Sequence, residues 1–416
     1  MSNYSFIKEV IKEKPINKRK LVLRIGFIII AAILFGIIAA IVFVHTRSLV
    51  EGNIEARKQP DEVDITDETD NVLVTTPLPS VTPVAEVVEV PVPAELGLSE
   101  YKKLYQDMKV VSQNAEKSIV TVIGIKSTID YFDDPYDNRG QLSGVLIANN
   151  GRELLVLTEY RVVEDVDKIQ VSFHNGRTVD AHYQKHDENT GLTIIRILIE
   201  QLDAETLAEI TMAPLGNSYK LVQSEPVIAL GSPTGASESI AFGAITSVTN
   251  KVSSWDTEYS LITTDILGTK GGSGVLLDLD GEIVGIIAQN YSNENNTVTA
   301  LSISPIKNLL QTLSNNGEIR YLGIKGKEVT EDISNNTGLP EGIYMESPKQ
   351  DSPAMQAGLM SGDVIVRVND EEVRTIAEYR KQLDVCTVGQ PVKLTVMRKG
   401  ATEYQEIVFD VMVEAL

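Results

Sequence analysis

A glycine-rich turn that carries a serine is the stretch whose residue types most directly suggest a reaction. Residues 268–286 read GTKGGSGVLLDLDGEIVGI, and Ser273 lies between glycines, ahead of two short apolar runs. A serine hydroxyl attacks a carbonyl carbon only when a nearby base takes its proton, and backbone N–H groups of the turn can stabilise the resulting oxyanion. Catalysis at Gly271, Gly272 and Ser273 therefore requires a base, and a group that orients it, elsewhere in the chain.

Composition excludes several other kinds of site. The 416-residue chain has one cysteine, Cys386, and four scattered histidines, so neither an intramolecular disulfide nor a metal site is expected, and no cofactor is predicted. The net charge is −21, although residues 1–24 carry seven Lys/Arg against two Asp/Glu. The acidic main body is therefore not expected to bind nucleic acid.

The elements that would position Ser273 are short strands. Apolar runs with a period of two fill about residues 116–304 and are separated by turn signals such as Asn175-Gly176. This spacing predicts an all-β barrel or sandwich, which periodicity alone does not distinguish.

Two helices are expected at the ends of this β region. The first covers 99–115, with Ser99 as its N-cap. The second falls within 302–316, where Leu310 and Leu313 share an apolar face, and it closes the domain before Asn315-Asn316-Gly317.

The N-terminal region contains an uncharged apolar run, IGFIIIAAILFGIIAAIVFV, at residues 25–44. A helix rises about 1.5 Å per residue, so this length matches a bilayer core of about 30 Å. A cleaved signal peptide is the alternative, but the run is long for one and no A-x-A pattern follows it. Basic residues precede the run and acidic residues follow Arg47, which predicts a cytoplasmic N-terminus and an extracytoplasmic body.

The β region resembles the protease domain of the HtrA/DegP family, in which the active site lies between two six-stranded β-barrels. The stretch from LSGVLIANNGRELLVLTEYRVV to KHDENTGLTIIRI resembles the family's segment that carries the catalytic His and Asp. VIALGSPTG and FGAITSV resemble its next strands, and TTDILGTKGGSGVLLDLDGEIVGI its nucleophile region. The resemblance covers nearly the whole β region and implies a mainly β, trypsin-like domain.

Two triad positions of that family hold unsuitable residues here. The family's histidine belongs to a T-N-N/Y-H-V-V pattern, and TEYRVV at 158–163 puts Arg161 in that position. A guanidinium stays protonated, so Arg161 cannot act as the base. The family's aspartate belongs to a T-D-L-A-V-L-K-I pattern, and TGLTIIRI puts Gly191 there.

The serine position has two alternative registers. The family reads G-N-S-G-G-P-L, whereas this chain reads GGSGVL at 271–276. Counting forward from Thr264-Asp265 assigns the nucleophile position to Ser273, and counting back from Leu276 assigns it to Gly272. In either register the loop is altered where its N–H groups must point at an oxyanion.

Other titratable groups are poor substitutes for the missing base. His182, His186 and Glu159 are expected on the surface, and Lys270 would have to fold back on Ser273 while losing its charge. The simpler expectation is a barrel domain that keeps its fold and a peptide-binding cleft but has lost its chemistry.

Residues 319–412 resemble a PDZ domain. The landmarks are SPA, AGL and GDVI within GIYMESPKQDSPAMQAGLMSGDVIVRV, followed by a helix at about 375–384 and the strand PVKLTVMRK. PDZ domains bind a peptide as an added strand, and N–H groups of a short loop hold its terminal carboxylate. The matching loop consists of Tyr321, Leu322, Gly323 and Ile324. On the helix, one face carries Ile376, Tyr379 and Leu383, which could line the groove or pack the core.

The sequence predicts five segments: a basic cytoplasmic tail (1–24), a transmembrane helix (25–44), an acidic Pro/Val/Thr-rich spacer (45–98), a trypsin-fold domain (99–317) and a PDZ domain (318–416). The expected function is binding of peptides or unfolded proteins through free C-termini, in envelope protein quality control, with an inactive protease domain. One alternative is an active serine endopeptidase that uses Ser273 on misfolded proteins. Another is a regulatory scaffold that assembles with an active relative. The partners considered also include a second copy of the chain, as a homo-oligomer, and an HtrA-like protein.

Overall fold

The computed structural model of the chain describes residues 60–65, 97–129, 135–292 and 296–416. Residues Asp61–Leu416 form one compact unit. Within the described ranges, no helix is both long enough and apolar enough to cross a membrane. The predicted span 25–44, the basic tail 1–24 and most of the spacer lie outside these ranges.

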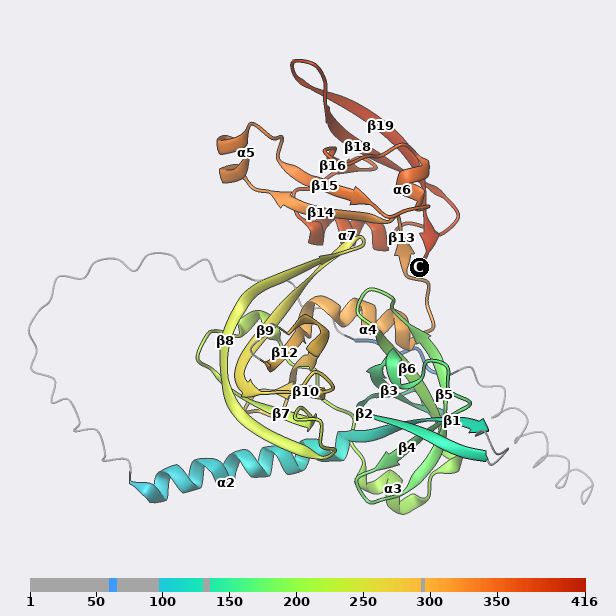
Figure 1. The fold of residues 1–416 in the computed structure, drawn as a ribbon, viewed down its shortest axis with the longest axis vertical. Helices are drawn as coiled ribbons and strands as arrows, with labels where there is room; N and C mark the ends of the chain where they lie inside the picture. The colour runs from blue at the N-terminus through green and yellow to red at the C-terminus, as the bar shows by residue number, and fades with distance from the viewer. Residues whose placement is uncertain (1–59, 66–96, 130–134, 293–295) are drawn as a thin grey trace, which may run out of the picture. The chain divides into compact units, whose positions relative to one another are not determined.

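The first domain begins with a closed barrel in the order β1-β2-β3-β6-β5-β4, in which the paired strands are antiparallel (Figure 1). Its strands are β1 (Ile119–Ile129), β2 (Pro135–Asn149), β3 (Glu153–Glu159), β4 (Lys168–Phe173), β5 (Thr178–His186) and β6 (Leu192–Leu198). Burial along β4 alternates, as expected for a strand with one face in the core, whereas β3 is buried along most of its length. The interior of this first barrel contains Val122, Leu146, Leu154 and Ile195.

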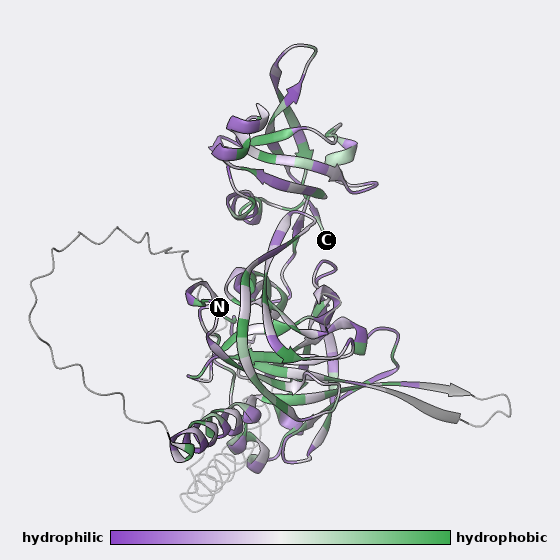
Figure 2. Cartoon of the chain, turned by 60° about the vertical axis from the view of Figure 1, so that its left-hand side comes forward, coloured by the Kyte–Doolittle hydropathy of each residue, from purple (hydrophilic) through white to green (hydrophobic). Residues whose placement is uncertain are grey.

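A second closed barrel follows in the order β10-β11-β12-β9-β8-β7. Its strands are β7 (Pro226–Ser232), β8 (Ser239–Ser254), β9 (Thr257–Leu267), β10 (Ser273–Leu277), β11 (Ile283–Ile287) and β12 (Thr297–Ser302). The two barrels confirm the trypsin-like architecture and decide between barrel and sandwich. Figure 2 shows hydrophobic residues concentrated along the strands of the barrels.

The helices of this domain differ in detail from the prediction. They are α2 (Leu98–Ala115), α3 (Ala204–Glu209) and α4 (Lys307–Ser314). The N-cap of α2 is Gly97, not Ser99, whose hydroxyl instead donates to the Glu100 carboxylate. The α4 helix is shorter than the predicted range because a 3₁₀ turn, Ser304–Ile306, which carries a proline, precedes it. The remaining 3₁₀ turns are Glu116–Ser118, Tyr160–Val162, Ile199–Gln201, Ser218–Lys220 and Gln289–Tyr291.

The C-terminal domain has the fold expected of a PDZ domain. Its sheet contains β14 (Ile324–Val329), β15 (Gly342–Pro348), β16 (Val364–Val368), β18 (Pro391–Lys399) and β19 (Tyr404–Met412) in that order, and β17 (Glu371–Glu372) pairs with β16. A separate pair joins β13 (Arg320–Tyr321) to β20 (Glu414–Ala415). The helices are α5 (Glu331–Thr337), α6 (Pro353–Gln356) and α7 (Ile376–Asp384). A capping box of Thr375 and Glu378 fixes the start of α7.

Candidate functional site

The residues at the predicted triad positions lie together where the two barrels meet. Arg161 is on the 3₁₀ turn Tyr160–Val162 that follows β3, and its Nη2 donates to the carbonyl of Gly271 at 3.3 Å. Gly191 precedes β6, and its carbonyl accepts a hydrogen bond from the N–H of Tyr160 at 2.7 Å. Arg161 therefore lies beside the glycine-rich loop of the second barrel, and Gly191 lies beside the 3₁₀ turn that carries Arg161.

Arg161 is held by a carboxylate. Its Nε and Nη2 donate to the two oxygens of Glu159 at 2.8 and 3.1 Å, so the pair is bidentate. The Glu159 side chain is 13% exposed and that of Arg161 45% exposed. Both carboxylate oxygens of Glu159 are therefore engaged by Arg161.

The hydroxyl of Ser273 points into the protein. Ser273 is the first residue of β10, is paired with Ser232 on β7, and is only 1% exposed. Its Oγ accepts a hydrogen bond from the N–H of Ser143 on β2 at 3.0 Å, while the Ser143 carbonyl accepts one from Thr158 at 3.0 Å. In this arrangement the Ser273 hydroxyl joins the two barrels.

The neighbouring glycines are required by close backbone approaches. A Cβ on Gly272 would lie 2.4 Å from the carbonyl oxygen of Pro233, and the Gly272 N–H donates to the Thr269 carbonyl at 2.8 Å. Gly274 has φ +126°, and a Cβ there would lie 2.1 Å from the Leu230 carbonyl oxygen. Position 272 thus has no room for a serine side chain in this backbone, and its N–H is turned to an internal partner.

The space beside these residues is small. A void lined by Ser143, Glu159, Gly274, Ile286 and neighbouring residues has a volume of about 10 Å³. A cavity needs about 10–15 Å³ to hold one water molecule. No substrate side chain can enter this void without movement of the barrels.

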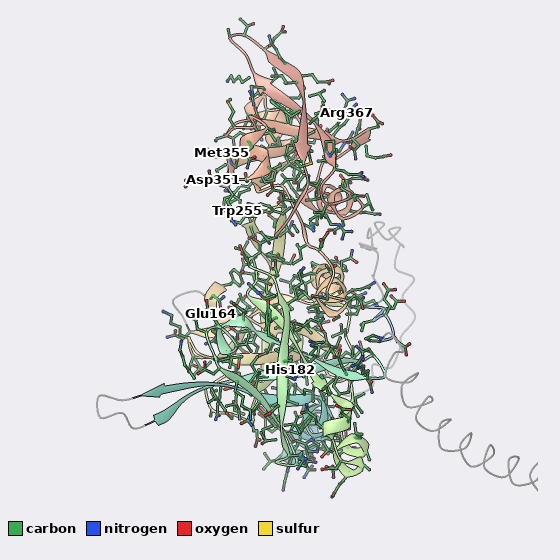
Figure 3. The ribbon with its side chains drawn as sticks, turned by 90° about the vertical axis from the view of Figure 1, so that its right-hand side faces the viewer. Glu164, His182, Trp255, Asp351, Met355 and Arg367 are labelled. Atoms are coloured by element: carbon green, nitrogen blue, oxygen red, sulfur yellow. The ribbon has the colours of Figure 1, made fainter. Side chains whose placement is uncertain are left out.

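The other histidines make contacts of their own. His186 stacks on Tyr160 with 3.7 Å between ring centroids, and its Nδ1 lies 2.7 Å from the Tyr183 hydroxyl. His174 pairs with Glu209 at 3.8 Å, and His182 is exposed on β5 (Figure 3). Lys270 is exposed on the glycine-rich loop. The described contacts give no bond from these groups to Ser273.

The loop at residues 321–324, called here the carboxylate loop, binds a carboxylate in this structure. The N–H groups of Leu322, Gly323 and Ile324 donate to the side chain of Asp256 at 2.8, 2.7 and 3.0 Å. Gly323 has φ +82°, and a Cβ there would lie 2.4 Å from Ser352. The predicted loop thus has the N–H geometry of a carboxylate site, and Asp256, which sequence reasoning missed, occupies it.

The three predicted residues of α7 are all buried in the core of the C-terminal domain, and two of them also line a void. Ile376 and Tyr379 line a small void together with Asp256 and Ile324, so they face the groove between β14 and α7. The Tyr379 hydroxyl donates to Asp256 Oδ1 at 2.6 Å. Leu383 is fully buried in the domain core, which was one of the two alternatives for this helix face. Burial, and then the charge of Asp256, hold the pKa of Tyr379 well above its usual range, so it stays a donor.

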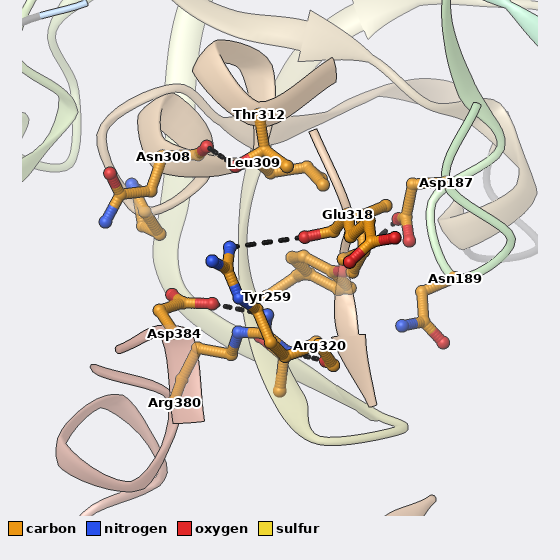
Figure 4. A pocket seen from close by; sticks show the side chains of 13 residues that line it. Asp187, Asn189, Tyr259, Asn308, Leu309, Thr312, Glu318, Arg320, Arg380 and Asp384 are labelled. Atoms are coloured by element: carbon orange, nitrogen blue, oxygen red, sulfur yellow. Dashed lines mark hydrogen bonds and ion pairs between the residues drawn. The ribbon is translucent and has the colours of Figure 1, made fainter. Parts of the chain in front are cut away.

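A cavity of about 180 Å³ lies where the barrels meet the C-terminal domain (Figure 4). Arg380 of α7 donates to the carbonyl of Arg320 at 3.0 Å, and Tyr259 of β9 donates to Asp187 at 3.4 Å. Burial and then the charge of Asp187 raise the pKa of Tyr259 well above its ordinary value. The turn between β5 and β6, which carries Asp187 and Gly191, therefore contacts β9, the strand that follows Asp256.

Comparison with protein families identifies both domains. A trypsin-like peptidase domain matches residues 142–286, and a PDZ domain matches residues 320–408. A probable periplasmic serine protease do/HhoA-like from Haemophilus influenzae is 28% identical over 271 residues, which cover 63% of this chain and 56% of that protein. The chain belongs to the HtrA/DegP family.

Further relatives agree with this assignment. The periplasmic pH-dependent serine endoprotease DegQ of Escherichia coli is 27% identical over 284 residues, 66% of this HtrA-like chain and 60% of DegQ. The chain thus spans little more than half the length of these relatives. The HtrA-type protease AlgW with decapeptide has a TM-score of 0.56 and 21% identity, and the match covers 74% of this chain and 98% of AlgW. At that identity the structural likeness shows the fold.

Proposed function

We propose that this HtrA-like chain is a membrane-anchored, extracytoplasmic protein that binds peptides through its PDZ domain and does not cleave them. The observation that carries this proposal is the Arg161 guanidinium, which is paired with Glu159 and bound to the Gly271 carbonyl, at the position that the family resemblance assigns to the catalytic base. A permanently protonated guanidinium cannot accept the proton of an attacking hydroxyl.

The nucleophile loop supports the same conclusion in both registers. If Ser273 is the nucleophile, its Oγ is buried and bound to the Ser143 N–H instead of facing a substrate. If Gly272 holds the nucleophile position, no hydroxyl is present and the Gly272 N–H is already used. The aspartate position, Gly191, has φ +71° and supplies no carboxylate.

Peptide binding is supported by the carboxylate loop, which presents three convergent N–H groups. Solved structures of AlgW contain a decapeptide or a tripeptide. By analogy, this chain would bind the free C-termini of peptides or unfolded proteins and act in protein quality control. The periplasmic relatives, together with the apolar run at 25–44 and its flanking charges, support a single-pass anchor with the body outside the cytoplasm.

The second candidate function is active serine-type proteolysis, which the names of the relatives favour. It requires Ser273 to turn outward and a new base to approach it. A cleavage assay separates the two functions. The full chain, in detergent, is incubated with fluorescein-labelled unfolded casein, beside a Ser273→Ala variant and a known serine protease as a positive control.

We expect the parent and Ser273→Ala to give the same background signal. Loss of a triad base costs on the order of 10⁶-fold in kcat, which is beyond the range of such an assay. Cleavage by the parent that Ser273→Ala abolishes would refute the inactive assignment and establish the endopeptidase. Cleavage that persists in Ser273→Ala would identify a contaminating protease.

A further inference from the structure

The carboxylate of Asp256 reaches the PDZ domain from the second barrel. Asp256 is at the tip of the β8–β9 hairpin, which extends to β14 and α7 (Figure 1). The residue is 2% exposed and has φ +60°. Such a conformation is uncommon for a residue with a side chain, although Asp and Asn adopt it more readily than most. The backbone of the turn thus holds the side chain at a defined angle.

The contacts of Asp256 are those expected of the last residue of a bound peptide. Its carboxylate accepts hydrogen bonds from three N–H groups of the carboxylate loop and from the Tyr379 hydroxyl. Its own N–H donates to the Ile324 carbonyl at 2.7 Å, the type of main-chain bond formed when a strand is added beside β14. An aspartate side chain and its backbone N–H thereby reproduce the polar groups of a C-terminal residue.

The site cannot hold a second carboxylate at the same time. The void that remains beside Asp256, lined also by Ile324, Gly326, Ile343 and Ile376, is only about 10 Å³. All three N–H groups of the loop are already engaged by one side chain. A peptide C-terminus can therefore bind here only after Asp256 has left.

The hairpin tip, defined as Trp255 and Asp256, is also held from the first barrel. Asn189 Nδ2 donates to the Trp255 carbonyl at 3.2 Å, and Ser254 Oγ donates to Asn189 Oδ1 at 2.9 Å. Figure 3 shows Trp255 at the end of the hairpin beside the C-terminal domain. Asn189 lies two residues before Gly191, so the tip joins the carboxylate loop to the turn that carries the predicted aspartate position.

We propose that Asp256 is an internal ligand of the carboxylate loop and that a peptide with a free C-terminus binds by displacing it. The proposal rests on the peptide-binding function proposed above. The groove residues Ile324, Ile343 and Ile376 are apolar, so the competing peptide has an apolar C-terminal side chain. The apparent Kd equals the intrinsic Kd divided by the fraction of molecules in which Asp256 has left the loop. Binding thus releases the hairpin tip.

The single tryptophan of the chain, Trp255, reports the position of the tip. The test measures acrylamide quenching of Trp255 fluorescence in the full chain, and binding of decapeptides that end in valine, as free acids or as amides. The variant is Asp256→Asn, which removes the charge and suits the positive φ. Glu258→Gln, on the same hairpin and paired with Lys251 at 2.7 Å, is the matched control.

We expect Asp256→Asn to increase Trp255 quenching without peptide and to lower the apparent Kd of the free acid at least ten-fold. The control should match the parent, and the free acid should increase Trp255 quenching in the parent whereas the amide should not. Equal quenching and equal peptide affinity in Asp256→Asn and the parent would overturn the internal ligand but leave peptide binding intact. If neither the parent nor Asp256→Asn binds the free-acid peptide, the proposed peptide-binding function is wrong, and the displacement with it.

If Asp256→Asn fails to fold by circular dichroism, Tyr379→Phe provides a second variant. It removes one of the four donors to Asp256 and keeps the loop backbone. Faster amide hydrogen exchange in residues 321–324 than in the parent supports the internal ligand, and unchanged exchange contradicts it.

Discussion

The Tyr379 hydroxyl should matter equally to the internal carboxylate and to a bound peptide. Its bond to Asp256 is 2.6 Å long, and both residues are only 2% exposed. A hydrogen bond to a charged group contributes about 1.5–3 kcal/mol net, so Tyr379→Phe should weaken occupation of the loop by Asp256 about 10- to 150-fold. The same substitution removes one donor from the peptide carboxylate.

These two effects should nearly cancel in the apparent Kd. When Asp256 binds more weakly, the fraction of molecules with an empty carboxylate loop rises, and it rises by the same factor by which the intrinsic Kd of the peptide increases. Without peptide, however, hydrogen exchange of the carboxylate loop, monitored by mass spectrometry, depends only on how often Asp256 leaves the loop. We therefore expect protection of residues 321–324 to fall about 10- to 150-fold while the apparent Kd of a free-acid peptide changes by less than about 3-fold.

Two results would refute this reasoning. Unchanged protection of residues 321–324 would show that the phenol does not hold Asp256 in the loop. An apparent Kd that worsens by the full factor would show that peptide and Asp256 do not compete. Tyr344→Phe, on β15 of the same sheet, is the matched control and should alter neither measurement.

Three further predictions follow from single features. Gly274→Ala should lower the free energy of unfolding by about 3 kcal/mol or more, because Gly274 has a positive φ and an added Cβ would clash with the Leu230 carbonyl. In the same urea denaturation, Gly271→Ala should be near neutral because a Cβ there meets no atom within 4 Å, and equal stabilities of the two variants would contradict the loop geometry. Burial and then the charge of Asp256 raise the pKa of Tyr321 to about 12, above its ordinary value of about 10. The contribution of Tyr321 to stability is therefore complete below pH about 10 and is lost as the pH rises through about 12. A difference titration against Tyr321→Phe that shows ionisation near pH about 10 would be inconsistent with this burial. Protease added to intact cells should remove a C-terminal tag, and a protected tag would reverse the proposed topology.

Sequence patterns predicted the architecture well because they report local geometry. Alternating apolar residues and Asn-Gly turns favour strands, and the structure forms them as two barrels in which Arg161 contacts the glycine-rich loop. The predicted helix at about 375–384 likewise agrees with α7, Ile376–Asp384, to within one residue at its start. These features depend on residues close together in the chain.

Long-range contacts were not predictable in the same way. Nothing in the sequence SSWDTEYS distinguishes Asp256 from an ordinary hairpin aspartate, and its partners are 66 to 123 residues away. The Oγ of Ser273 accepts a hydrogen bond from the N–H of Ser143, 130 residues earlier, a contact that the glycine-rich turn around Ser273 does not indicate. Tertiary packing decided both positions.

Reaction with a serine-directed fluorophosphonate reports whether the protease domain has a working nucleophile, because the reagent requires an activated hydroxyl and no knowledge of the substrate. The full chain and Ser273→Ala are incubated with the probe beside an active serine protease, and mass spectrometry locates any adduct. Ser273 is buried and bound to Ser143, and the described residues provide no base bonded to its hydroxyl, so we expect no adduct on this chain while the active protease is labelled. Stoichiometric labelling at Ser273, lost in Ser273→Ala, would contradict this expectation and establish a working nucleophile.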